Sequence, residues 1–94
     1  MATFSKEVDV VGAATYPATP QVLIPFTPED VLVLVEHPTL AIYVSFDGTT
    51  DAGKLTPGIC VALEWHQHVS KVWLRVDSAA SPGPIIARVI SEDY

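Results

Sequence analysis

The sequence predicts an all-β fold: a single small β-sandwich, jelly-roll or Ig-like, of about seven or eight short antiparallel strands. Three observations predict it. Thirteen Val, six Ile and eight Thr stand against seven Leu, so residues that suit a pleated surface dominate. Eight Pro and five Gly recur at short intervals and leave little room for a long helix. Between these breaks, apolar and polar residues alternate with a period of two.

Length and composition predict one domain that covers residues 1–94. Apolar residues make up 49% of the chain and charged residues 17%, against about 25% charged in an average globular protein. A folded chain with so few charges is expected to have part of its surface covered by a partner. The first 20 residues hold little that would anchor them, and we expect residues 1–20 to extend as an N-terminal arm that adds a strand to a neighbour's sheet.

The first elements are expected in the Val- and Pro-rich N-terminal region. Val8–Ala13 is the first expected strand, and it ends near Gly12. Gln21–Phe26 is the second. Because Pro20 and Pro25 bound this run, we expect it at the edge of a sheet.

The middle of the chain predicts two further strands and a tight turn. Val31–Val35 is apolar throughout and β-branched at alternate positions, which is typical of a strand covered on both faces. Thr27–Asp30 before it has the start signals of a single helical turn, which is the alternative. Leu40–Phe46 alternates again, and Asp47 and Gly48 close it with a strong turn signal. We expect Asp47 to cap this turn by an Asx-type hydrogen bond and not to bind calcium.

The last part of the chain is expected to hold three strands and two loops. Thr49–Gly58 is interpreted as a polar loop, Ile59–Trp65 as a strand with the clearest alternation in the chain, and Val69–Asp77 as its return. Ser78–Pro84 is a second loop, and Ile85–Ile90 closes the fold. The expected core consists of Val33, Val35, Ile42, Val44, Phe46, Val61, Leu63, Trp65, Val72, Leu74, Val76, Ile86 and Val89.

One group of residues has the spacing of metal ligands. Glu64, His66 and His68 are two residues apart, and Cys60 lies further along with the same parity, so an unbroken strand would place them on one face. Imidazoles and a carboxylate can hold zinc. However, a hairpin that begins at His66 or Gln67 would break the alternation. We therefore interpret the group as polar residues at a hairpin end and expect no metal.

Enzymatic chemistry finds no support in the sequence. The chain has no Gly-x-Ser-x-Gly motif and no glycine loop for phosphates, and its single Cys60 lies within an expected strand. We expect a non-enzymatic protein without catalytic residues or cofactors.

A candidate interface lies on the Val69–Asp77 strand. Lys71, Trp73 and Arg75 share one face, where an aromatic ring flanked by two cations could stack bases or contact a protein. Five basic against eleven acidic residues give a net charge of −6, which argues against nucleic acid as a partner. We therefore predict a protein interface and assign Tyr16 and Phe26 to it as well. Packing of Trp73 in a second layer of the sandwich is the alternative.

Three motifs follow one another over roughly residues 40–90. Val44–Thr49 reads VSFDGT, Leu55–Gly58 reads LTPG, and Lys71–Arg75 reads KVWLR. In this order they resemble small virion proteins of tailed bacteriophages, which are β-rich accessory subunits of the head or of its junction with the tail. The resemblance implies a structural protein of the virion, assembled in the host cytoplasm, and above all a capsid decoration or cement subunit. It implies the major capsid protein or other virion proteins as partners and a homo-oligomer, by analogy a trimer.

Two alternatives to capsid decoration stay open. One is a head–tail or tail-adaptor subunit that assembles as a ring. The other is a carbohydrate-binding module with Trp73 or Trp65 as its stacking platform. We expect no membrane partner, because no stretch approaches the ~20 apolar residues of a membrane span. We also expect no signal peptide, because charged residues interrupt the N-terminus at Lys6 and Glu7.

Overall fold

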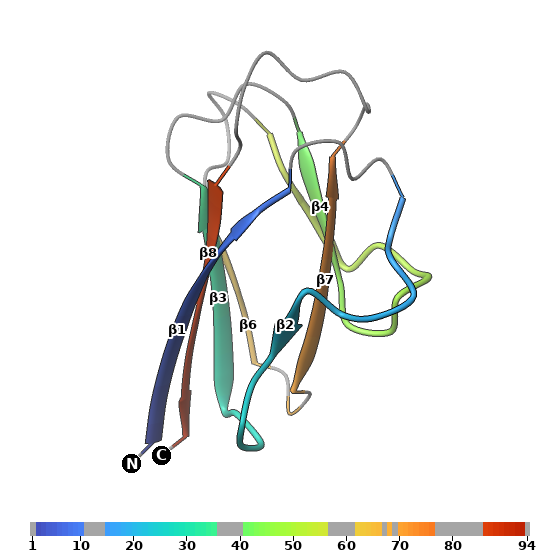
Figure 1. The fold of residues 1–94 in the computed structure, drawn as a ribbon. Helices are drawn as coiled ribbons and strands as arrows, with labels where there is room; N and C mark the ends of the chain where they lie inside the picture. The colour runs from blue at the N-terminus through green and yellow to red at the C-terminus, as the bar shows by residue number, and fades with distance from the viewer. Residues whose placement is uncertain are drawn as a thin grey trace.

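Two four-stranded antiparallel sheets pack face to face (Figure 1). The computed structural model describes residues 2–10, 15–35, 41–56, 62–66, 68, 70–76 and 86–93. The β8 sheet has the order β1 (Ala2–Asp9), β8 (Ile86–Asp93), β3 (Asp30–Val35), β6 (Ala62–Trp65). The β7 sheet has the order β2 (Val22–Leu23), β7 (Lys71–Val76), β4 (Ile42–Ser45), β5 (Gly53–Leu55). The predicted all-β sandwich of about eight strands is confirmed.

The strand order distinguishes between the two predicted kinds of sandwich. Strand β1 pairs with β8, β2 with β7, β3 with β6 and β4 with β5. The pairs are therefore nested within one another, like the paired positions of a single long hairpin. This nested pairing is that of a jelly roll. In an Ig-like sandwich the first and last strands lie in different sheets. The fold is therefore a jelly roll.

The core lies between the sheets and consists almost entirely of aliphatic side chains. Eight of the predicted core residues are buried: Val33, Val35, Ile42, Val44, Val72, Leu74, Val76 and Val89. Three more pack against its border: Phe46, Leu63 and Trp65. The prediction for Ile86 is wrong, because the inward positions of β8 are Ala87, Val89 and Ser91, which leaves Ile86 41% exposed on the opposite face. Val61 lies outside the described residues.

The first strand lies earlier in the chain than expected. It spans Ala2–Asp9 instead of Val8–Ala13, and all eight of its residues pair with β8. In the single chain this part of the expected arm is thus an edge strand of its own sandwich, and addition of the arm to a neighbour's sheet stays a prediction. Residues 11–14 lie outside the described part.

The second strand lies at a sheet edge, as predicted from its flanking prolines. Among the described residues β2 pairs with β7 alone. The side chain of Gln21 continues this pairing, since its amide donates to the Leu74 carbonyl at 2.6 Å and accepts from the Leu74 amide at 3.0 Å. The side-chain amide of Gln21 thus forms the hydrogen bonds to the Leu74 backbone that a longer β2 would form with its own backbone.

Three other expectations concern the strand at residues 31–35, the turn at Gly48 and the loop that follows it. Asp30–Val35 is a strand without a preceding helical turn, so the strand interpretation is confirmed. Gly48 has a φ of +83°, which confirms the turn. The expected loop Thr49–Gly58 is partly wrong, because it contains β5, in which Leu55 is fully buried opposite Ile42. A three-residue strand with one apolar residue is too short to show alternation.

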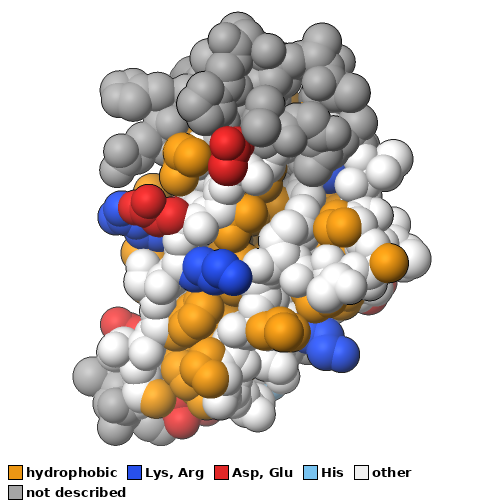
Figure 2. All heavy atoms as spheres, in the orientation of Figure 1, with side chains coloured by type: hydrophobic (Ala, Val, Ile, Leu, Met, Phe, Trp, Pro, Cys, Tyr) orange, Lys and Arg blue, Asp and Glu red, His pale blue; other side chains and the backbone are white. Residues whose placement is uncertain are grey.

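One side of the sandwich is incompletely closed. Figure 2 shows hydrophobic side chains gathered between the sheets where β1 and β2 form their edges. Phe4, Val8 and Phe26 are partly buried and pack against the core. The ammonium group of Lys6 donates to the Gln21 carbonyl at 3.2 Å and so links the two edges.

Candidate functional site

The turn after β4 forms a closed polar loop on the outside of the β7 sheet. Asp47 Oδ1 accepts hydrogen bonds from the amides of Thr49 and Thr50, both at 2.8 Å, and from the Ser45 hydroxyl at 2.9 Å. The amides of Thr50 and Thr49, followed by Ser45, hold the pKa of Asp47 well below its usual range. The Ser45 hydroxyl in turn accepts from the Gly48 amide at 3.0 Å. The predicted Asx-type cap is thus confirmed, and it fixes the shape of this loop.

This loop covers Trp73 on β7. The side chain of Trp73 lies on the outer face of its strand, since Val72 and Leu74 on either side point into the core, yet Trp73 is only 8% exposed. A Cβ atom at Gly48 would lie 3.0 Å from the indole, so the loop lies directly against the ring. Among the described residues the Trp73 indole N–H has no acceptor. Trp73 is therefore covered by this loop on the outer face of its sheet and does not pack between the two sheets.

An arginine cluster, formed by Tyr16, Tyr43, Asp51 and Arg75, lies on the same outer face. The Arg75 guanidinium donates to both carboxylate oxygens of Asp51, at 2.9 and 3.3 Å, and its central carbon lies 3.9 Å from the centre of the Tyr43 ring. The Tyr16 hydroxyl donates to the same carboxylate. An open hollow of about 240 Å³ is lined by Thr15, Tyr16, Thr49, Asp51 and Arg75.

The pKa values of the cluster follow from these contacts. The hydrogen bond from Arg75, followed by that from Tyr16, lowers the pKa of Asp51. Burial, followed by the hydrogen bond to Asp51, raises the pKa of Tyr16 above its ordinary value. The hydrogen bond to Asp51 raises the pKa of Arg75. These groups satisfy one another, so the cluster forms a preordered polar surface.

The residues predicted for the interface are divided among four places. Tyr16 and Arg75 meet in the arginine cluster, although they lie 59 positions apart in the sequence. Lys71 is exposed at the start of β7. Trp73 is covered, and Phe26 packs against the core. The interface itself stays a prediction. Two residues of the arginine cluster, Tyr43 and Asp51, were not predicted. Tyr43 could have been found, because the alternation of its strand places it on the outward face. Asp51 lies in a loop, where the sequence gives no such signal.

The other sheet presents an aliphatic patch on its outer face, formed by Leu32, Leu34, Ile86 and Ile90. Leu32 pairs with Ile90 across β3 and β8, and both are half-buried, as is Leu34. Ile86 is 41% exposed. Near one end the ion pair of Glu7 and Arg88 crosses the patch, because Arg88 lies between Ile86 and Ile90 on β8 and opposite Leu34. At the other end lies a hollow of about 110 Å³ whose lining includes three acidic side chains: Asp30, Glu64 and Glu92.

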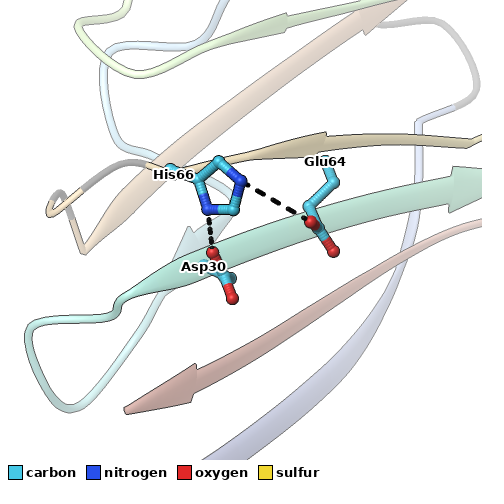
Figure 3. Close-up of side chains that lie close together, drawn as sticks. All are labelled: Asp30, Glu64 and His66. Carbon is cyan, nitrogen blue, oxygen red and sulfur yellow. Dashed lines mark hydrogen bonds and ion pairs between the residues drawn. The ribbon is translucent and has the colours of Figure 1, made fainter. Parts of the chain in front are cut away.

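Three potential metal ligands meet at that acidic end (Figure 3). The β3–β6 register pairs Leu32 with Glu64, so Asp30 lies across from His66 just beyond the last paired residues. The Nδ1 atom of His66 is hydrogen-bonded to Asp30 Oδ1, and its Nε2 atom lies 4.0 Å from Glu64 Oε1.

Of the three described residues with ligand spacing, Glu64 and His66 are thus brought together. Strand β6 ends at Trp65, as the expected hairpin required, and His68 instead lies with its Nδ1 atom 3.0 Å from the Pro28 carbonyl. Cys60 lies outside the described residues. Asp30 was not predicted, because a partner on another strand becomes visible only once the register is known.

No protein-family model and no curated protein matches the chain. In the described part of the chain, no helix is long and apolar enough to cross a membrane.

Proposed function

We propose that the chain is a non-enzymatic structural subunit of a tailed-bacteriophage virion, and that it acts as a capsid decoration or cement subunit. The observation that carries the proposal is the aliphatic patch. Leu32 and Ile90 lie opposite each other, and Leu34 and Ile86 lie on the same outer face of a four-stranded sheet, in a protein of only 94 residues. Such a surface is typical of a protein that binds another protein.

Burial of the patch against a neighbour would stabilise an assembly. A fully buried Leu or Ile contributes about 1.5–3 kcal/mol, so Ile86, which is 41% exposed, has about 0.6–1.2 kcal/mol still to gain, and the other three have less. The acidic side chains of Asp30, Glu64 and Glu92 border the patch at one end, as polar residues border the core of an interface, and the Glu7–Arg88 ion pair lies within it. The jelly-roll frame holds this surface rigidly, since every described strand is paired. The class of particle comes from the sequence resemblance.

The test is binding to preformed heads. Purified chain is mixed with expanded phage heads that lack it, and co-sedimentation and electron microscopy measure its occupancy. We expect wild-type protein to bind and Ile86→Lys to lose binding, because the charge would have to be buried. The matched control is Leu23→Lys, since Leu23 is 57% exposed on the other sheet. Absence of wild-type binding, or equal binding of both variants, would contradict the proposal.

The head–tail or tail-adaptor subunit is the second candidate, because the same patch would join copies of the chain into a ring. Size-exclusion chromatography with light scattering distinguishes the two candidates. A ring subunit assembles from purified chain alone, whereas a decoration subunit reaches its final state on the head.

A carbohydrate-binding module has less support from the geometry. Trp73 is 8% exposed. Trp65 packs edge to face against Phe46 with the ring centres 5.3 Å apart. Neither indole therefore presents the open ring face that a sugar would stack on.

A further inference from the structure

The acidic end of the aliphatic patch combines an imidazole with carboxylates from two strands. Glu64 and His66 lie two residues apart on extended chain and point to the same side, and Asp30 approaches from β3 (Figure 3). Their potential ligand atoms all lie within 4.8 Å of one another. Imidazole nitrogen and carboxylate oxygen are both donors that zinc accepts.

Asp30 determines which nitrogen of His66 is free to bind. A neutral imidazole carries its proton on one nitrogen and a lone pair on the other. An ionised carboxylate can only accept, so the hydrogen bond from Nδ1 to Asp30 selects the tautomer with the lone pair on Nε2. Asp30 is itself well held, since its backbone carbonyl accepts from the buried hydroxyl of Ser91 at 2.7 Å. The same arrangement orients histidine ligands in known metal sites.

The free nitrogen of His66 faces the carboxylate of Glu64. Nε2 of His66 lies 4.0 Å from Glu64 Oε1, which is too far for a direct hydrogen bond. Tetrahedral zinc, with bonds of about 2.0–2.1 Å to nitrogen and oxygen, needs these two atoms about 3.3–3.4 Å apart. A small movement of the exposed His66 and Glu64 side chains would bring them to that separation. The His66 side chain is 81% exposed and that of Asp30 20%, so the binding nitrogen is open to solvent while the orienting carboxylate is mostly covered.

We propose that His66 Nε2 and Glu64 bind a divalent transition-metal ion, with zinc as the best fit, and that Asp30 positions the imidazole. The carboxylate of Glu92 lines the same hollow and adds negative charge beside the ion. The remaining coordination positions are open. This site does not rest on the proposed virion role.

The experiment is isothermal titration of the untagged full chain with zinc chloride. We expect a binding event with one ion per chain that His66→Gln removes and Glu64→Gln weakens. Asp30→Asn should lower the affinity about 10–100-fold, the usual effect of losing the group that orients a metal-bound histidine. His68→Gln is the matched control and should bind like wild type, because His68 contacts the Pro28 carbonyl away from the site.

A second measurement separates positioning by Asp30 from a general structural effect. Long-range nitrogen–proton NMR of the metal-free chain should show His66 with its proton on Nδ1, and zinc should shift the Nε2 signal. In Asp30→Asn the tautomer preference should be lost while the rest of the spectrum is preserved. The proposal is overturned if wild type binds no zinc, if His66→Gln binds as tightly as wild type, or if Asp30→Asn changes neither the affinity nor the tautomer.

Discussion

Truncation of Leu55 to alanine tests whether the short strand β5 belongs to the core. Leu55 is fully buried and lies opposite Ile42 in the β7 sheet. Leu55→Ala removes three buried carbon atoms, which at about 0.8 kcal/mol each lose about 2.4 kcal/mol of transfer free energy. The cavity that remains adds to this loss, so we expect the free energy of unfolding to fall by about 3–4 kcal/mol. For a domain of this size, that lowers Tm by roughly 12–32 °C.

Urea denaturation followed by circular dichroism measures the change, and Leu23→Ala is its control. The chemical change is identical, but Leu23 is 57% exposed on β2, so its truncation should alter the free energy of unfolding by no more than about 0.5 kcal/mol. Equal losses in the two variants would refute the placement of Leu55 in the core and, with it, β5 as the partner of β4.

Three further predictions concern the outer face of the β7 sheet. Gly48→Ala should destabilise the fold by about 1–3 kcal/mol, because φ at this position is +83° and the new Cβ would lie 3.0 Å from Trp73. Urea denaturation measures the change, and an unchanged midpoint would contradict the prediction. The pKa of Asp47 is lower in the folded than in the unfolded chain, so its contribution to stability is complete above the unfolded value of about 3.9 and is lost as the pH falls further. Wild type should therefore lose more stability than Asp47→Asn between pH 5 and pH 2, and parallel pH profiles would contradict this. Asp51→Asn should lower the pKa of Tyr16 toward its ordinary value, because the carboxylate whose hydrogen bond and charge raise this pKa is removed. An ultraviolet titration measures the pKa, and an unshifted titration would show that Asp51 does not act on Tyr16.

The strand content was predictable because it depends on local pattern. The alternation of Lys71–Val76 placed Val72, Leu74 and Val76 on one face, and all three are fully buried. The errors occur where the pattern is weak. Strand β5 has a single apolar residue, and the first strand, with Lys6 and Glu7 in it, does not look apolar because it lies at a sheet edge.

The candidate sites were predictable only in part, because their members come from different strands. Arg75 and His66 were recognised from their own segments. Their partners Asp51 and Asp30 lie 24 and 36 positions earlier and became visible only with the register of the sheets. Trp73 shows the opposite case, since its segment predicted an outward side chain and the Gly48 loop then covered it.

By itself the sequence determined that this chain forms short strands around an aliphatic core, because side-chain branching, proline positions and period-two alternation act within a few neighbouring residues. Only the tertiary structure decided that these strands nest as a jelly roll, that Ile86 and its neighbours form an outward aliphatic patch, and that Asp30 meets His66. These outcomes depend on which strands pair and in which register, and a shift of one residue would turn every side chain of a strand to the opposite face.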